Sequence, residues 1–349
     1  LVVSLWIRLK LHESPAFKRM VAESTERQAP FRESFATWRI GKYVLIALVG
    51  IMFAQGAVWY AGYFYTRFFM ERVLKVEVAT VDGLILAITV ASAVLYVFFG
   101  WLSDRVGRKA VMLFGMTLML VAYFPGFHML AQTGNPALAE AEARTPVVVV
   151  ADPADCSLQF DPVGKASFTS SCDIAKSTLA NAGVSYSNQA APAGTPARVM
   201  IGEVAVPSAS AAGLPKDQAT AAKTAVESAI KSGLAAAGYP AKADPARVNL
   251  AGVFGVLFVF VIAATALFGP IAATLVELFP TRIRYTAMSL PYHIGTGWIG
   301  GFVPFTAFAI VAATGDIYSG LWYPFAFTAL SVVTCFFLLP ETNGRSLDQ

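Results

Sequence analysis

Six long stretches of this chain contain no Asp, Glu, Lys or Arg, and this feature constrains the fold more than any other. An α-helix needs about 20 apolar residues to cross the hydrocarbon core of a bilayer, and each stretch is long enough. Only 14% of the 349 residues are charged, whereas soluble domains average about 25%. We therefore predict an all-α membrane protein with transmembrane helices within Tyr43–Thr66, Gly83–Ser103, Ala110–Gln132, Leu250–Val276, Tyr285–Gly315 and Ile317–Pro340.

The six predicted helices form two three-helix units with a small polar insert between them, an order typical of secondary transporters built from inverted repeats. The apolar stretch Leu1–Ile7 lacks a basic leader and a cleavage site, so we interpret it as the end of an earlier helix and expect an N-terminal part to precede it. The predicted organisation is the end of a preceding helix plus a cytoplasmic loop (1–42), three transmembrane helices (43–132), an extracytoplasmic insert domain (133–249), three transmembrane helices (250–340) and a cytoplasmic tail (341–349).

The short loops on one side of the predicted membrane hold 14 Lys and Arg, and those on the other side hold 3. Because basic residues accumulate in cytoplasmic loops, we expect both ends in the cytoplasm and residues 133–249 in the periplasm, with a bacterial inner membrane as the location. Cys156 and Cys172 both fall in this insert. Disulfides persist in oxidising compartments, so we predict a bridge between them, with two free thiols as the alternative.

The insert has a different composition, rich in Ala, Pro, Ser and Asp. "TPVVVVADP" is typical of a strand that ends in a turn, and "ARVMIGEVAV" alternates enough for a second strand. "SSCDIAKSTLANAGVSY" predicts a helix capped by Ser171 and stopped by Gly183. "LPKDQATAAKTAVESAIKSGLAAAGYP" predicts an amphipathic helix. We therefore expect a small α/β domain, with disorder as the alternative because aromatic residues are few.

One stretch has the spacing of a nucleotide-binding motif. "GTGWIG" matches G-x-G-x-x-G, but no strand precedes it and it lies within an apolar run. We interpret its glycines as helix-packing residues, because Gly297 and Gly301 form a small-xxx-small pair. The three histidines are scattered, with no Cys or carboxylate at metal-ligand spacing. The sequence thus predicts no metal site, no cofactor and no enzyme.

A dense charged turn separates the second and third predicted helices. "DRVGRK" carries four charges in six residues. Membrane orientation alone explains the basic residues, but not Asp104 or Gly107. The turn resembles the signature loop of the major facilitator superfamily, roughly G-x-x-x-D-R-x-G-R-[KR]. "LHESPAF", "ELFPTRIR" and "PETNGRSL" resemble the motifs of that family after its sixth, tenth and twelfth helices. The matching residues of the turn are Gly100, Asp104, Arg105, Gly107, Arg108 and Lys109.

The resemblance covers both ends and the middle of the chain, and it implies helices seven to twelve of a twelve-helix transporter. "PTRIRYTAMSLPYHIGTGWIGGFVPF" is most similar to the metabolite:proton symporter branch, whose members carry organic acids, osmolytes and related solutes. The implied function is proton-coupled symport of a small polar metabolite by alternating access. The implied partners are the solute, protons, the lipid bilayer and the missing N-terminal half, with no nucleic acid. A sugar porter, a membrane receptor or sensor with the insert as ligand-binding domain, and a structural membrane subunit are the alternatives.

The resemblance places the solute site between two six-helix halves, near the middle of the membrane. A polar amide in hydrocarbon is costly unless it faces protein or water, so Gln55 is the best cavity candidate in the first helix. Trp59, Tyr60 and Tyr63 lie on or beside the same helix face, and anchoring at the membrane interface is the alternative for them.

The fifth predicted helix contributes Tyr292 and His293, which follow Pro291. A proline frees backbone groups, which is tolerable where protein or water satisfies them. His293 is a candidate for binding the solute or relaying protons, and a packing role is the alternative.

Charged residues at the cytoplasmic helix ends are expected to form a gate that closes that side of the transporter. An acid at a helix end needs a partner, and the family resemblance suggests that these ends cluster in one state and separate in another. The predicted gate residues are Glu13, Asp104, Arg105, Gly107, Arg108, Glu277 and Arg282.

Overall fold

The computed structural model describes residues 5–6, 33–35, 37–163 and 165–345. Within these residues, six helices are long and apolar enough to cross a membrane, which confirms the predicted all-α membrane class. Most of these spans extend beyond the charge-free stretches, because a helix continues past the hydrocarbon core where its ends are solvated. Spans one to six are Trp38–Val73, Val78–Val106, Arg108–Gly134, Leu250–Leu278, Arg284–Thr314 and Ser319–Leu338.

Spans one and five contain π-helical segments, in which backbone hydrogen bonds join residues five positions apart instead of four. Such segments are frequent at functional sites. In span five, Pro291 lies inside α14, one turn before the π segment, and a proline inside a helix removes one backbone donor. Span one consists of α4 (Trp38–Ala47), η1 (Leu48–Met52), α5 (Phe53–Trp59), η2 (Tyr60–Tyr65), α6 (Thr66–Phe68) and η3 (Phe69–Val73). Span five consists of α14 (Arg284–His293), η5 (Ile294–Gly300) and α15 (Val303–Thr314).

The other spans are more regular. Spans two and three are the single helices α7 (Val78–Val106) and α8 (Arg108–Gly134). Span four breaks at Gly269–Pro270 into α12 (Leu250–Phe268) and α13 (Ile271–Leu278), and span six is η6 (Ser319–Leu321) followed by α16 (Trp322–Leu338).

The two three-helix units are continuous in sequence but interleaved in space. Span four, which begins the second unit, packs through α12 against α7 and α8 of the first unit. Span one, which begins the first unit, packs through α5 against η5 and α16 of the second. Each unit therefore places its first helix among the helices of the other.

The insert folds as a small α/β domain, so the disorder alternative is wrong. Its four-stranded sheet has the order β2-β1-β3-β4. The central strand β1 pairs in parallel with β2 and antiparallel with β3, and β3 and β4 form a hairpin. The elements of the insert are α9 (Pro136–Arg144), β1 (Val147–Ala151), η4 (Pro153–Asp155), α10 (Ser171–Ala182), β2 (Ser187–Ala190), β3 (Arg198–Ile201), β4 (Val204–Pro207) and α11 (Lys216–Ala236).

Two details of the insert differ from the sequence predictions. "ARVMIGEVAV" forms the hairpin β3–β4 instead of one strand, because Gly202 turns the chain with a φ of 58°. The cap of α10 is Ser170, whose hydroxyl accepts a hydrogen bond from the Asp173 N–H, and not Ser171. Cys156 and Cys172 are joined by a disulfide, with their Cα atoms 5.1 Å apart.

The insert is attached to the end of α15, where the last helical carbonyl oxygens have no intrahelical partner. The Tyr186 hydroxyl donates to the Ala312 oxygen (2.5 Å), and the Asn188 amide donates to the Thr314 oxygen (2.8 Å). The Tyr186 N–H donates to the Gly315 oxygen (2.8 Å). These bonds join the insert to span five, and they use carbonyl groups that would otherwise need water.

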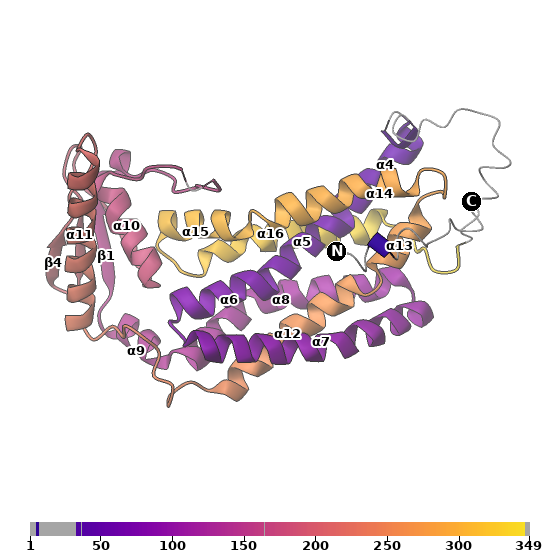
Figure 1. The fold of residues 1–349 in the computed structure, drawn as a ribbon, viewed down its shortest axis with the longest axis horizontal. Coiled ribbons are helices and arrows are strands. Elements are labelled where there is room, and N and C mark those ends of the chain that lie inside the picture. Colours follow the sequence, from indigo (N-terminus) through magenta and orange to yellow (C-terminus); the bar gives the residue numbers. More distant parts are fainter. Residues whose placement is uncertain (1–4, 7–32, 36, 164, 346–349) are drawn as a thin grey trace.

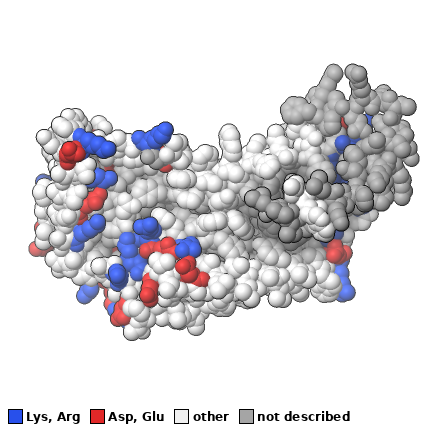
Figure 2. Space-filling model, in the orientation of Figure 1, with Lys and Arg blue, Asp and Glu red and all other residues white. Residues whose placement is uncertain are grey.

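The molecule is elongated, with the insert at one end and α4, α13 and α14 at the other (Figure 1). On the face that Figure 2 shows, charged side chains gather at and beside the insert, and the central part is almost free of them. A central band without charges is the surface that a lipid bilayer requires.

Candidate functional site

The charged turn between α7 and α8 lies at the end of the bundle opposite the insert (Figure 1). Gly107 adopts a φ of 103°, which L-residues with a side chain rarely tolerate. A Cβ atom at this position would also lie 2.6 Å from the Glu341 Oε2 atom. Gly107 therefore permits both the turn and the close approach of a carboxylate from the C-terminal tail.

Glu341 binds the beginning of α8. Its carboxylate accepts hydrogen bonds from the backbone N–H groups of Arg108 (2.9 Å) and Lys109 (3.2 Å). The first N–H groups of a helix have no intrahelical partner and attract negative charge. Partial burial raises the pKa of Glu341, but hydrogen bonds from four backbone N–H groups outweigh it and lower the pKa below the ordinary value of 4.5.

Arg108 occupies the centre of the cluster. Its guanidinium pairs with Glu277 of α13 at 3.1 Å, and the two side chains are only 11% and 13% exposed. It also pairs with Asp104, and it donates to the Ser103 hydroxyl at 2.8 Å. A buried arginine needs several acceptors for its five N–H donors, and these three side chains supply them.

The C-terminal tail completes the cluster. The Thr342 hydroxyl donates to the Glu277 Oε2 atom (2.8 Å), and the Asn343 amide donates to the backbone oxygen of Asp104 (3.1 Å). The cluster thus joins the α7–α8 turn, α13 and the tail, which are three segments far apart in the sequence. Glu341 and Thr342 are absent from the predicted gate, although the "PETNGRSL" stretch contains both.

The structure does not bring all predicted gate residues together. Asp104, Gly107, Arg108 and Glu277 meet, whereas the Arg105 guanidinium lies 4.2 Å from the centre of the Trp101 ring. Arg282 pairs with Glu33, away from Arg108. These two arginines are therefore outside the cluster that Arg108 forms. The remaining predicted gate residue, Glu13, lies outside the described residues.

Gln55 lies at the contact between spans one and five. It is 2% exposed, and its Oε1 atom accepts a hydrogen bond from the Thr296 hydroxyl of η5 at 2.8 Å. The amide therefore faces protein, as its cost in hydrocarbon requires. Thr296 was not among the predicted cavity residues, because a threonine in an apolar run is not conspicuous.

Glycines let these two spans approach closely. A Cβ atom on Gly56 would lie 2.1 Å from the Gly295 oxygen, and a Cβ atom on Gly300 would lie 2.3 Å from the Tyr60 ring. The packing interpretation of "GTGWIG" is thus correct, but the predicted pair is wrong. A Cβ atom added to Gly297 would have no neighbouring atom within 4 Å. A Cβ atom added to Gly301 would contact only the backbone of Gly297 in the same span. The helix rotation that places Thr296 beside Gln55 turns Gly295 and Gly300, instead of Gly297, toward span one.

The predicted aromatic residues of span one form a cluster around Trp59. The Trp59 ring lies 5.5 Å from Tyr60, 5.8 Å from Tyr63 and 5.2 Å from Phe64, measured between ring centres. Trp59, Tyr60 and Tyr63 are half-buried, and Phe64 is exposed. Trp59, Tyr60 and Tyr63 thus lie together one to two helical turns beyond Gln55. The six helices cover these three side chains only in part.

Tyr292 and His293 lie at the end of α14, immediately before η5. Tyr292 is half-buried and His293 is exposed, and their rings are 5.8 Å apart. Neither the described helices nor the insert buries the His293 side chain. In the described part of the chain, no group of three or more His, Cys, Asp or Glu residues could hold a metal ion.

Six helices that could each cross a membrane, joined by polar contacts between them and by a charged cluster at one end, define a polytopic membrane protein. A sequence model of the sugar (and other) transporter family matches residues 6–147 and 222–349. The chain belongs to this family, and with it to the major facilitator superfamily, whose members are transporters and not enzymes. The match omits residues 148–221, which include most of the insert.

Curated relatives match shorter parts of the chain. A putative proline/betaine transporter of Staphylococcus aureus (strain MSSA476) is 30% identical over 128 residues, which are 36% of this chain and 27% of that protein. The citrate-proton symporter of Klebsiella pneumoniae is 35% identical over 69 residues, which are 20% of this chain and 16% of that protein.

A putative metabolite transport protein of Haemophilus influenzae is 29% identical over 110 residues, which are 32% of this chain and 25% of that protein. The chain thus matches about a quarter or less of the length of these relatives. No solved structure matches the chain.

Proposed function

We propose that this chain is the helix seven-to-twelve half of a secondary transporter that carries a small polar metabolite together with protons by alternating access. Family membership supports transport. The relatives named as proline/betaine transporter and citrate-proton symporter support an osmolyte or an organic acid as the solute. The solute path lies between this half and an N-terminal half, and its residues here are Gln55, Trp59, Tyr60, Tyr63, Tyr292 and His293.

The cluster around Arg108 is the observation that carries the proposal. Its contacts join helix ends that are distant in sequence, and most of them are polar or ionic. Polar contacts at a membrane surface separate into water with little cost, whereas apolar contacts do not. The cluster therefore works as a latch that stabilises one state of a two-state equilibrium, and it does so on the cytoplasmic side.

Uptake measurements test the proposal. Cells that make the complete protein are given labelled citrate, glycine betaine or glucose, with and without a protonophore. We expect uptake of citrate or glycine betaine, and its loss when the proton gradient collapses. Uptake of glucose alone would favour the sugar-porter alternative, which the family description also covers. Transport that is insensitive to the protonophore would contradict proton coupling.

Paired variants test the role of Gln55. The Gln55→Ala variant is expected to reduce uptake about tenfold, as expected for the loss of one or two hydrogen bonds to a solute, with an unchanged amount of protein in the membrane. Thr296→Val removes the helix–helix hydrogen bond but keeps the amide. Equal loss of uptake in both variants would assign Gln55 to helix packing instead of the solute path.

A further inference from the structure

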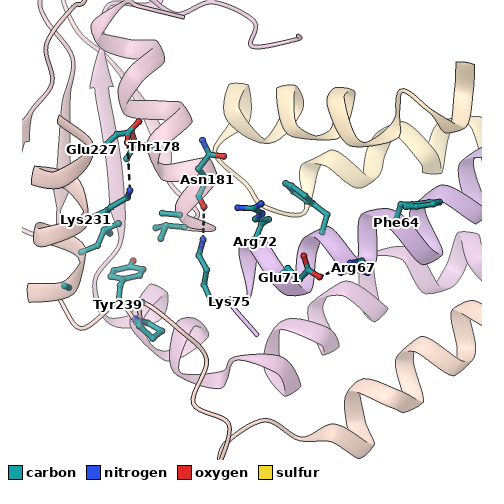
Figure 3. Close-up of a pocket in the computed structure, with 17 residues that line it drawn as sticks. Phe64, Arg67, Glu71, Arg72, Lys75, Thr178, Asn181, Glu227, Lys231 and Tyr239 are labelled. Atoms are coloured by element: carbon teal, nitrogen blue, oxygen red, sulfur yellow. Dashed lines mark hydrogen bonds and ion pairs between the residues drawn. The ribbon is translucent and has the colours of Figure 1, made fainter. Parts of the chain in front are cut away.

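A cavity of about 780 Å³ lies between the end of span one and the insert, far from the cluster around Arg108. Its walls come from η2, α6 and η3 on the membrane side and from α10 and α11 on the insert side (Figure 3). Sites for metabolite-sized ligands usually measure about 300–1,000 Å³ and lie where domains meet. This cavity has both properties.

The charges around the cavity are not balanced. Four basic side chains and two acidic side chains line it. Arg67 pairs with Glu71 and with Asp82 (both 2.8 Å), so its charge is matched. Lys231 lies at 4.0 Å from Glu227, which is the outer limit of an ion pair. Arg72 makes no ion pair or hydrogen bond with any described residue, so the cavity offers cations that lack counterions.

Lys75 adds a second, independent observation. It has a φ of 57°, and no other described residue except glycines has a positive φ. Such backbone conformations are costly for a residue with a side chain and occur preferentially at functional sites. This conformation directs the Lys75 ammonium toward the Asn181 carbonyl oxygen, to which it donates at 2.8 Å (Figure 3). An ammonium group has three donors, so two remain for a ligand.

The electrostatics of Lys75 favour an anion as its neighbour. Burial, followed by the nearby charges of Arg72 and Lys231, lowers the pKa of Lys75 below its ordinary value of 10.5. The two neighbouring cations thus act on Lys75 from both sides of the cavity, one from η3 and one from α11. A bound anion would stabilise all three charges at once.

Much of the remaining wall is apolar, although Thr178 and Asn181 of α10 also line it. Phe64 and Phe68 come from span one, and Leu234, Tyr239 and Pro240 come from the insert. A ligand that fits both kinds of wall has a short carbon skeleton and carboxylate groups that accept charge-assisted hydrogen bonds.

We propose that this cavity binds a small organic anion through its carboxylate groups, with Arg72, Lys75 and Lys231 as the cationic contacts. The site lies at the end of span one, beyond the solute path proposed for Gln55. It gives a role to the insert, of which the family match omits residues 148–221. Binding is measured without transport, and variants of Arg72 and Lys231 assign it to this cavity, so the two proposals fail independently.

The test uses the purified protein in nanodiscs of neutral lipid and titration calorimetry. The probes are acetate, succinate and citrate, and succinamide serves as the uncharged analogue of succinate. We expect saturable binding of at least one carboxylate and no binding of succinamide. No saturable binding of any of the three anions, or equal binding of succinate and succinamide, would overturn the proposal.

Charge-removing variants locate the site. Arg72→Gln and Lys231→Gln are each expected to weaken binding about tenfold, as for the loss of one charge-assisted hydrogen bond. Both side chains are exposed, so the unfolding temperature without ligand should not change. Lys216→Gln is the matched control, because Lys216 lies on α11 but does not line this cavity. An equal loss in the control would contradict the assigned contacts.

Lipid provides the last comparison. Succinate or citrate binding that persists in nanodiscs with phosphatidylglycerol supports a water-soluble ligand. Loss of binding in those nanodiscs would mean that a lipid headgroup occupies Arg72, Lys75 and Lys231, and it would overturn the proposal.

Discussion

Glu341, in the tail, lies at the first turn of α8, where its carboxylate accepts hydrogen bonds from two backbone N–H groups of that helix. It acts as a helix cap supplied by a residue 233 positions away in the sequence. The same carboxylate accepts a hydrogen bond from the backbone N–H of Arg108, whose guanidinium is the centre of the ionic cluster. Single residues at this end therefore combine a structural role with the role proposed for them in the latch.

The Glu341→Gln variant removes the charge but keeps the shape. We expect a loss of about 1 kcal/mol of stability at neutral pH, as for the loss of a helix cap, whereas Glu203→Gln in the exposed β3–β4 turn changes nothing. Because the pKa of Glu341 is lowered in the folded protein, its contribution is present above pH 4.5 and is lost as the pH falls through the lowered pKa. The free energies of unfolding of the parent protein and of the Glu341→Gln variant should therefore approach each other as the pH falls from 7 into the acid range. A difference in unfolding free energy that stays constant with pH would contradict this role.

Burial distinguishes the two acids that pair with Arg108. Glu277 is 13% exposed and Asp104 is 62% exposed. Removing one partner of a buried pair costs about 3–5 kcal/mol, whereas an exposed pair contributes about 0–1 kcal/mol. We therefore expect Glu277→Gln to lower the unfolding temperature and to raise the cytoplasmic accessibility of a cysteine probe in the solute path more than Asp104→Asn does. Equal effects on probe accessibility would mean that the buried pair is not the latch.

At the scale of elements, the C-terminal end of α15 joins the insert to the bundle. The Tyr186 hydroxyl donates to the Ala312 oxygen, and Tyr186 is 6% exposed. The other donors, from Asn188 and the Tyr186 N–H, bind the same helix end. We therefore expect the insert to follow span five when that helix moves.

The Tyr186→Phe variant tests this attachment. Loss of one buried hydrogen bond costs about 1–2 kcal/mol, which should lower the unfolding temperature by about 2–4 °C. Amide hydrogen exchange at the end of α15 should accelerate. Tyr285→Phe is the control, because Tyr285 is 83% exposed. An unchanged exchange rate at the end of α15 would show that the remaining bonds suffice.

At the scale of the whole molecule, the interleaved spans make one bundle with two chemically different ends. One end carries the cluster around Arg108, and the other carries the insert with its disulfide and its cationic cavity. The excess of basic residues in the loops at the first end supports its cytoplasmic location.

Thiol labelling tests that orientation. Cys156 and Cys172 are joined by a disulfide and Cys335 is buried, so the background reaction is low. A membrane-impermeant reagent added to intact cells should label Glu203→Cys in the insert. Asn343→Cys in the tail should react only after the membrane is permeabilised. The reverse pattern would invert the proposed topology.

The hydropathy and charge of local segments were sufficient to predict the six spans and the folded insert between them. The family came instead from the resemblance of the "DRVGRK" turn to a known signature loop, which the family match bears out. These features depend on neighbouring residues, because a helix in lipid satisfies its own backbone and needs only an apolar surface. Small local errors remained, such as the cap of α10 and the β3–β4 hairpin, since single serine and glycine positions decide them.

Only the tertiary structure decided which of these residues meet. It placed Glu341 and Thr342 beside Arg108 and Glu277, left Arg105 and Arg282 elsewhere, and paired Gln55 with Thr296. Lys75, Arg72 and Lys231 likewise come together only because the insert lies against span one. The physical reason is that such contacts depend on how each helix is rotated and on which helix packs beside it, and residues far apart in the sequence determine both.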